Sequence, residues 1–231
     1  MYDEGFIYRR FLSRCMNILV IYKKSAYERY TSTDDAHDYV NAQSEDAQWI
    51  RKTHQEHNRT LDHVKVVLDQ KGIPYSLCER DCLTNEMDGY DLIICVGGDG
   101  TVLKASHYVE HVPLMGVNSA PHSSHGHFTC CTRETFERTF DQIKTMPRTC
   151  FARLTCTIDG KRINELALND ILFAHQHPAA ASRYRIDGVM HHNSGLLVSS
   201  AAGSTGWMYQ EGGTIMGPQD QHIQVYHRGE R

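Results

Sequence analysis

The sequence predicts an α/β fold, in which an N-terminal α/β domain with a parallel sheet is followed by a mainly antiparallel β domain. From residue 17 to about 120, apolar runs of strand length alternate with helical patterns, as is typical of a parallel sheet. After an expected helix near 133–145, strand patterns follow with few helical stretches. Asp159-Gly160 separates two of these patterns, and this dipeptide is a strong hairpin signal.

The N-terminal domain is expected over residues 16–130, and its strands over 17–22, 74–79, 91–96 and 113–117. Residues 24–45 are polar and are interpreted as an excursion or an irregular helix. A long amphipathic helix is expected over 46–71, with Gly72 as its C-cap. Its apolar face is supplied by Trp49, Ile50, Leu61, Val64, Val67 and Leu68.

The second domain is expected over residues 131–231, with strands at 150–158, 162–173, 182–187 and 195–200. At the other end of the chain, residues 1–15 contain three arginines but also Asp3 and Glu4, so they fit a transit peptide poorly. We interpret Met16 as the functional start, or residues 1–15 as a dispensable extension.

Composition excludes several function classes. The 231 residues contain 24 Lys and Arg against 28 Asp and Glu, a net charge of −4, which gives no sign of nucleic-acid or membrane binding. No apolar run reaches the roughly 18 residues of a transmembrane helix. The 8 cysteines are scattered without a Cys-x-x-Cys pair. We therefore expect free thiols in a reducing compartment and a cytoplasmic protein.

The stretch Gly97-Gly98-Asp99-Gly100-Thr101 follows an apolar strand and precedes a segment that can open a helix. Glycines allow a sharp turn and the close approach of a ligand. The amino end of a helix offers free N–H groups and a positive dipole end to an anion. A carboxylate in such a turn would repel phosphate, so the expected task of Asp99 is to bind or deprotonate a sugar hydroxyl. The alternative is a plain glycine turn with a capping aspartate.

Two further elements carry polar groups in apolar surroundings. Asn169 and Asp170 interrupt an apolar strand, where polar side chains are costly to bury without partners. They are candidates for ligand contacts, or else a structural hydrogen-bonded pair at a bulge. A loop of small residues, Gly203-Ser204-Thr205-Gly206, then precedes Trp207 and, further on, a Gly-Gly pair.

In their order and spacing these three elements resemble the NAD kinase family over residues 16 to 216. The likeness is greatest to the mitochondrial-type branch, because of the segments 22–30, 116–121 and 124–127 and of Trp207, where most members have Tyr. The first motif alone is shared with lipid kinases of the diacylglycerol and sphingosine type. The resemblance implies an NAD kinase/diacylglycerol kinase-like fold with the active site between the two domains.

The resemblance implies that the 2′-hydroxyl of the adenosine ribose of NAD or NADH attacks the γ-phosphate of ATP, giving NADP or NADPH. Asp99 matches the family's proton acceptor, and Mg²⁺ would enter with ATP. No residue of the chain is expected to bind a metal by itself. The expected cofactor-binding residues are Gly97, Gly98, Gly100, Thr101, Lys104, Asn118, Asn169, Asp170, Ser182, Ser194, Gly203, Ser204, Thr205, Gly206, Trp207 and Gln210.

Departures from the family pattern leave alternatives open. Ser194 stands where many members have an Asp that contacts the nicotinamide end, and His192 stands at a basic position. A non-catalytic NAD-binding module, or a kinase of a lipid or other small-molecule acceptor, therefore remains possible. The sequence leaves open the choice between NAD and NADH, and between ATP and polyphosphate as donor.

Family chains normally continue well beyond the Gly-Gly pair, whereas this chain ends at residue 231. Sheet edges left open in this way invite pairing with another chain, so we expect a homo-oligomer. The 15 histidines raise the question of zinc, but His122, His125 and His127 do not have the spacing of a typical zinc site. Ordinary loop histidines are the favoured interpretation.

Overall fold

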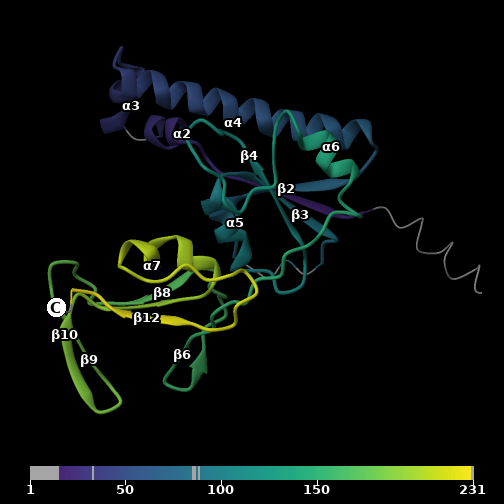
Figure 1. Ribbon diagram of the computed structural model, residues 1–231. Helices are drawn as coiled ribbons and strands as arrows, with labels where there is room; N and C mark the ends of the chain where they lie inside the picture. Colours follow the sequence, from purple (N-terminus) through teal and green to yellow (C-terminus); the bar gives the residue numbers. More distant parts are fainter. Residues whose placement is uncertain (1–15, 33, 85–86, 88, 230–231) are drawn as a thin grey trace, which may run out of the picture. The chain divides into compact units, whose positions relative to one another are not determined.

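The computed structural model describes residues 16–32, 34–84, 87 and 89–229. A five-stranded parallel sheet organises the first part of the chain, in the order β2-β1-β3-β4-β5 (Figure 1). Its strands are β1 (Ile18–Tyr22), β2 (Tyr75–Glu79), β3 (Leu92–Gly97), β4 (Leu114–Asn118) and β5 (Cys131–Thr132). The parallel sheet confirms the predicted fold class for this part.

Helices cover both faces of this sheet (Figure 1). They are α2 (Ala26–Thr31), α3 (Asp34–Asn41), α4 (Glu45–Gln70), the 3₁₀ turn η1 (Arg80–Cys82), α5 (Asp99–Ser106) and α6 (Phe136–Asp141). On one face, α4 and α6 pack on alternate residues of β1 and β3, such as Ile18 and Ile94. On the other face, α5 packs on Ile21, Ile93 and their neighbours. Every residue of β3 is buried, as expected for a central strand covered on both sides.

The long helix ends as predicted. Gly72 has a φ of 64°, and its N–H donates to the Asp69 carbonyl while the Ile73 N–H donates to the Leu68 carbonyl. This pair of bonds is a Schellman motif, which satisfies carbonyls that the helix leaves without partners. For one residue, the predicted apolar face of this helix is wrong. Trp49 is 50% exposed and makes an edge contact with the ring of His122, whereas the neighbouring Ile50 is buried.

Two other helical predictions change in extent. The polar segment 24–45 forms two short helices, α2 and α3, of which α2 begins with a capping box between Ser25 and Glu28. The helix expected over 133–145 is limited to α6, with turns on both sides.

The second part of the chain contains small antiparallel sheets. Its elements are β6 (Thr157–Ile158), β7 (Lys161–Arg162), β8 (Asp170–Phe173), β9 (Ser182–Ile186), β10 (Val189–Asn193), β11 (Leu196–Ser199), η2 (Ala202–Thr205), α7 (Trp207–Gln210) and β12 (Gln224–His227). Strands β12, β11 and β8 pair side by side in one sheet, and β9 pairs with β10 in another. The antiparallel pairing confirms the predicted character of this part.

Two hairpins in this part share one turn chemistry. Asp159-Gly160 joins β6 to β7, and both residues have positive φ, 49° and 77°, as a type I′ turn requires. Asp187-Gly188 joins β9 to β10 with φ of 49° and 84°. The first hairpin was predicted and the second, with strand β10, was missed although it carries the same dipeptide. The expected long strands 150–158 and 162–173 are wrong in extent, because only short pieces of them pair.

The chain divides into two compact units, one that ends at Met146 and one that comprises Pro147–Arg231. The boundary lies later than the division expected after residue 130, because β5 pairs with β4 and α6 packs against α4. In the part of the chain that the structure describes, no helix is long and apolar enough to cross a bilayer.

Candidate functional site

The first unit places its glycine motif where open parallel sheets bind ligands. In the strand order β2-β1-β3-β4-β5, β2 is added on one side of β1 and the later strands on the other, so the strand order reverses between β1 and β3. Ligands bind beyond the carboxyl ends of the strands at such a point. Lys23 follows β1 directly, and Gly98 and Asp99 follow β3. The topology therefore brings the end of β1 and the glycine turn to one edge of the sheet.

The turn from β3 into α5 is tightly packed. A Cβ atom at Gly97 would overlap the Thr101 hydroxyl and lie 2.9 Å from the Thr101 Cβ. At Gly98, the N-cap of α5, a Cβ would lie 2.8 Å from the Ser124 hydroxyl, and no side chain caps the helix. Gly100 has more room, because the nearest atom to its Cβ position is Nη1 of Arg80 at 3.9 Å. The amino end of α5 thus keeps its backbone donors clear of a capping side chain.

Asp99 is half-buried, and its carboxylate is held by the backbone. Oδ2 accepts the N–H of His127 at 3.0 Å, and Oδ1 accepts the N–H of Phe128 at 2.7 Å. A carboxylate has about four lone-pair positions, so two donors leave acceptor capacity on it. The two hydrogen bonds fix the orientation of the carboxylate and leave that capacity for a further donor such as a hydroxyl.

The segment that holds Asp99 is itself fixed against β4. A Cβ at Gly116 would lie 2.5 Å from the Phe128 carbonyl oxygen and 2.8 Å from the Thr129 Cα. Asn118, at the end of β4, uses both polar atoms of its side-chain amide in the same loop. Its Oδ1 accepts the Ala120 N–H at 3.1 Å, and its Nδ2 donates to the Ser124 carbonyl at 2.9 Å. Asn118 therefore shapes the loop, and its predicted contact with the cofactor stays a prediction.

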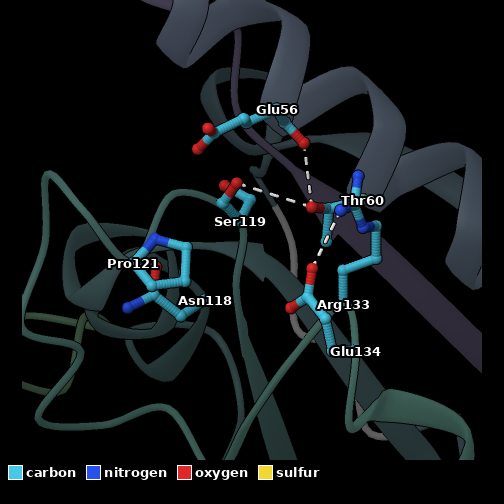
Figure 2. A pocket seen from close by; sticks show the side chains of 7 residues that line it. All are labelled: Glu56, Thr60, Asn118, Ser119, Pro121, Arg133 and Glu134. Atoms are coloured by element: carbon cyan, nitrogen blue, oxygen red, sulfur yellow. Dashed lines mark hydrogen bonds and ion pairs between the residues drawn. The ribbon is translucent and has the colours of Figure 1, made fainter.

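A small pocket lies between the end of β4 and helix α4 (Figure 2). Its volume is about 30 Å³, which has room for about two water molecules and is too small for a nucleotide. Inside it, the Thr60 hydroxyl donates to the Glu56 carbonyl at 2.8 Å, and Arg133 pairs with Glu134 at 2.8 Å. The lining residues are Glu56, Thr60, Asn118, Ser119, Pro121, Arg133 and Glu134.

Two of the three candidate zinc histidines have other contacts. His122 Nδ1 lies 2.6 Å from the Glu56 carboxylate, and His127 packs edge-on against the ring of Phe128. Within the described ranges, no three His, Cys, Asp or Glu side chains gather in a way that could hold a metal ion.

Cationic side chains collect near the glycine turn. Burial, followed by the charges of Arg80 and Arg29, lowers the pKa of Lys23. Arg80 follows β2 and reaches toward Gly100, and it also pairs with Asp81 at 3.0 Å. Lys104, a predicted contact, points along α5 and donates to the Tyr108 hydroxyl at 3.0 Å. Lys23 and Arg80 were missed from the sequence, and the available signal was their position directly after two parallel strands.

In the second unit, the Asn169–Asp170 pair lies under the small-residue loop. A Cβ at Gly203 would lie 2.5 Å from the Ser199 hydroxyl, and 2.6 Å from both the Asn169 carbonyl and Asp170 Oδ1. The backbone joins the two segments as well, because the Ser200 N–H donates to the Asn169 carbonyl at 2.9 Å. The structure thus brings together two motifs that are more than thirty residues apart in the sequence.

Four buried side-chain atoms have no hydrogen-bond partner in the part of the chain that is described: Thr101 Oγ1, Asn169 Oδ1, Asp170 Oδ1 and His57 Nε2. Three of the four belong to predicted site residues. Burial raises the pKa of Asp170, and a hydrogen bond with Ser199 opposes the rise only in part. Buried polar atoms without partners cost free energy and are rare, so each of them calls for a physical reason.

Three predicted serines differ in their surroundings. The Ser182 hydroxyl accepts the His175 N–H at 2.7 Å, and Ser204 donates to the Ala201 carbonyl at 2.7 Å while it accepts the Met216 N–H. These two hydroxyls hold their own loops together. Ser194 is exposed, and its N–H donates to the Arg228 carbonyl at 2.8 Å.

Several residues at the end of the glycine loop and in α7 (Trp207–Gln210) face solvent. Thr205 and Gln210 are exposed, and Gly206 is the N-cap of α7. Trp207 is 36% exposed, and its indole N–H donates to Glu211 at 3.0 Å. The guanidinium of Arg228 lies 4.6 Å from the Trp207 ring centre and pairs with Glu211 at 2.7 Å. This arrangement fixes the indole ring at the surface of the second unit.

Comparisons with known proteins agree with one another. A family model described as the ATP-NAD kinase N-terminal domain matches residues 7–146. A probable NADH kinase of Oryza sativa subsp. japonica is 33% identical over 196 residues, which cover 73% of this chain and 60% of that protein. An NADH kinase of Arabidopsis thaliana is 31% identical over 211 residues, which cover 73% of this chain and 62% of that protein. The chain therefore spans about three fifths of the length of these plant relatives.

Solved structures show the same fold. An NAD kinase from Archaeoglobus fulgidus in complex with ATP matches with a TM-score of 0.62 and 20% identity, over 93% of this chain and 72% of that one. A yeast NADH kinase complexed with NADH matches with a TM-score of 0.60 and 13% identity, over 94% of this chain and 67% of that one. At these identities the likeness establishes the fold alone.

Proposed function

The chain belongs to the NAD kinase family, and on this basis we propose that it transfers a phosphoryl group from ATP to NAD or NADH. The acceptor is the 2′-hydroxyl of the adenosine ribose, and the products are NADP or NADPH, ADP and a proton. The observation that carries the proposal is the pair of buried polar atoms without partners at Asn169 and Asp170. A polar ligand would supply the missing hydrogen bonds, and both residues belong to a motif that resembles this family.

We assign to Asp99 the role of binding and deprotonating the ribose hydroxyl that reacts. The N–H groups of His127 and Phe128 fix the carboxylate, so its remaining lone pairs point in a defined direction. A ribose hydroxyl that donates to one of them is oriented for attack and can lose its proton to the carboxylate as the bond to phosphorus forms. General-base assistance of this kind contributes about 10²–10⁴-fold.

Backbone and cationic groups are suited to the phosphates. The uncapped amino end of α5 presents N–H donors, and Lys23 and Arg80 add positive charge beside it. Phosphoryl transfer depends mainly on positioning and charge neutralisation, which these groups provide. Mg²⁺ held by the phosphates and water would supply further neutralisation.

In the second unit, we assign Asn169, Asp170 and the segment 203–210 to the dinucleotide. The free Oδ1 atoms of the first two residues suit hydroxyl or amide donors, and Trp207 offers an aromatic face. A reducing, cytoplasmic location and a homo-oligomeric state remain predictions. The seven described cysteines are free, as a reducing compartment requires.

The test is a coupled assay of NADP formation with ATP and Mg²⁺, in which Asp99→Asn is compared with wild type. We expect turnover to fall about 10²–10⁴-fold while the fold is retained. Asp91→Asn is the matched control, since the Asp91 carboxylate also accepts a backbone N–H, that of Asn17 at 2.8 Å, but at the amino end of β3. Full turnover in Asp99→Asn would exclude Asp99 as the base. Binding of NAD without turnover in the wild type would favour a non-catalytic binding module.

A further inference from the structure

Cys130 and Cys131 form a pair of adjacent thiols at the start of β5, the edge strand of the parallel sheet. Both thiols face one acceptor, the Gly116 carbonyl, at 3.4 Å from the Cys130 Sγ and 3.8 Å from the Cys131 Sγ. Cys130 is exposed, whereas Cys131 is 7% exposed. The pair therefore joins an accessible thiol to a buried one.

The surroundings make the two thiols chemically different. The contact between the two thiols lowers the pKa of Cys130 to about 7, whereas the same contact and burial raise the pKa of Cys131. Thiolate is the nucleophilic form of cysteine. An accessible, acidic thiol next to a second cysteine is the arrangement found in redox-sensing sites.

The pair is also linked to the carboxylate assigned to catalysis. The Cys130 N–H donates to the Gly116 carbonyl at 2.9 Å, and the two residues before it lie against Gly116 without room for a methyl group. The Phe128 N–H, two residues from Cys130, is one of the two donors to Asp99. A movement of the backbone at Cys130 therefore changes the position of a donor to Asp99.

We propose that Cys130 and Cys131 are a reversible thiol-oxidation site for peroxides, and that their oxidation switches off the Asp99 site. The Cys130 thiolate attacks one oxygen of hydrogen peroxide, the O–O bond breaks, and the products are a sulfenic acid and, with a proton, water. The Cys131 thiol then displaces the hydroxyl of the sulfenic acid, and its proton leaves with that hydroxyl as a second water. The net change is the loss of one hydrogen from each thiol and the reduction of one peroxide to water.

A disulfide between Cys130 and Cys131 can form only if the backbone moves. Consecutive Cα atoms lie about 3.8 Å apart, which is shorter than the ~4.4–6.8 Å of ordinary disulfides. A disulfide between neighbours is therefore strained, and bringing the two Sγ atoms together requires the backbone around this peptide to rotate. This rotation disturbs the pairing of Cys131 with Val117 and the hydrogen bond from the Cys130 N–H to the Gly116 carbonyl. A strained disulfide is easily reduced, so a dithiol restores the original state.

The experiment exposes the reduced full chain to limiting hydrogen peroxide and maps every cysteine by peptide mass spectrometry over time. We expect a Cys130–Cys131 disulfide to form before any change at Cys82 or Cys150, which are also exposed. In Cys131→Ser, the sulfenic acid should persist at Cys130, where dimedone traps it as an adduct. Cys130→Ser should form neither the disulfide nor this adduct. Oxidation at Cys82 or Cys150 as fast as at Cys130 would overturn the assignment of the site.

The effect on Asp99 rests on the proposed function and has two readouts. Oxidation should lower kinase turnover about 100-fold, the loss expected from a misplaced catalytic group, and dithiothreitol should restore it. Cys130→Ser should keep its turnover after peroxide treatment, and Cys82→Ser should lose it as wild type does. Hydrogen exchange at the amides of His127 and Phe128 should also speed up on oxidation, whatever the activity is. A disulfide that leaves this exchange unchanged would refute the link to Asp99, whereas an inactive wild type would refute only the proposed function.

Discussion

Replacing Gly97 and Gly100 separately by alanine tests how tightly the glycine turn is packed. An alanine methyl at Gly97 would overlap the Thr101 hydroxyl, and rotating that side chain brings no relief because the Thr101 Cβ would still lie 2.9 Å away. Thr101 is 1% exposed and has no space to retreat. Overpacking of this kind costs about 1–3 kcal/mol. Alanine also makes the unfolded chain less flexible, which offsets about 0.4–1 kcal/mol of this cost. We therefore expect the free energy of unfolding to fall by about 1–2 kcal/mol.

Gly100 is the matched control, because it lies in the same motif but in the first turn of α5 and has open space around it. Alanine there should gain about 0.5–1 kcal/mol from its better helix propensity. The two variants should therefore differ by about 1.5–3 kcal/mol, which corresponds to roughly 3–12 °C in melting temperature for a chain of this size. Thermal unfolding followed by circular dichroism measures this difference.

The kinase assay separates the two glycines in a second way. If Gly100 lines the site as proposed, a methyl there hinders the approach of substrate, so Gly100→Ala should lose turnover although it is the more stable variant. A Gly97→Ala protein that melts at or above the wild-type temperature would refute the packing described for the turn. Equal melting temperatures for the two variants would refute it as well.

Two predictions concern pH. Burial lowers the pKa of His57 from 6.5 to about 4, so the folded chain binds fewer protons than the unfolded one between these values. The contribution of neutral His57 to the free energy of unfolding is complete above pH 6.5 and is lost as the pH falls through 4, a change of about 3 kcal/mol. Urea unfolding at several pH values measures this change, and His57→Gln should not show it. Burial raises the pKa of Asp170, so its charged form weakens the folded state once the pH exceeds the ordinary value of 3.8. Asp170→Asn should therefore melt higher than wild type at pH 7 but not near pH 3, and calorimetry should show weaker NAD binding.

Much of the fold could be predicted because single residues decide it locally. Gly72 ends α4 through its positive φ, and Asp159-Gly160 forms a hairpin through two positive φ values. The errors arise where tertiary packing decides. Trp49 has the spacing of the apolar face, but at 50% exposure it lies at the margin of that face, where the ring of His122 is its neighbour. The strands expected near 150–173 have the right residue types, and their extent depends on which partners the chain brings to them.

The site could be predicted where one motif is contiguous and not where it is assembled. The residues 97–101 form one turn, so its position followed from a strand and a helix on either side. Arg80 comes near the glycine turn through the sheet order, which places β2 beside β1, and its position after a strand gives only the end of the sheet at which it lies. The donors to Asp99 are backbone N–H groups of His127 and Phe128, and any residue type except proline supplies such a donor.

Asn118 and Asp170 show how the structure can rank residues that the sequence treats alike. Both are polar, both lie at an end of a strand, and both were predicted to contact the cofactor. Each polar atom of the Asn118 amide already has one partner, so a ligand that reaches it adds a hydrogen bond without relieving an unsatisfied buried atom. Asp170 Oδ1 has no partner among the described residues, so a donor that reaches it removes a penalty of about 1–3 kcal/mol already present in the free protein. Substitution at Asp170 should therefore weaken dinucleotide binding more directly than substitution at Asn118, whose loss should be felt through the loop that it shapes.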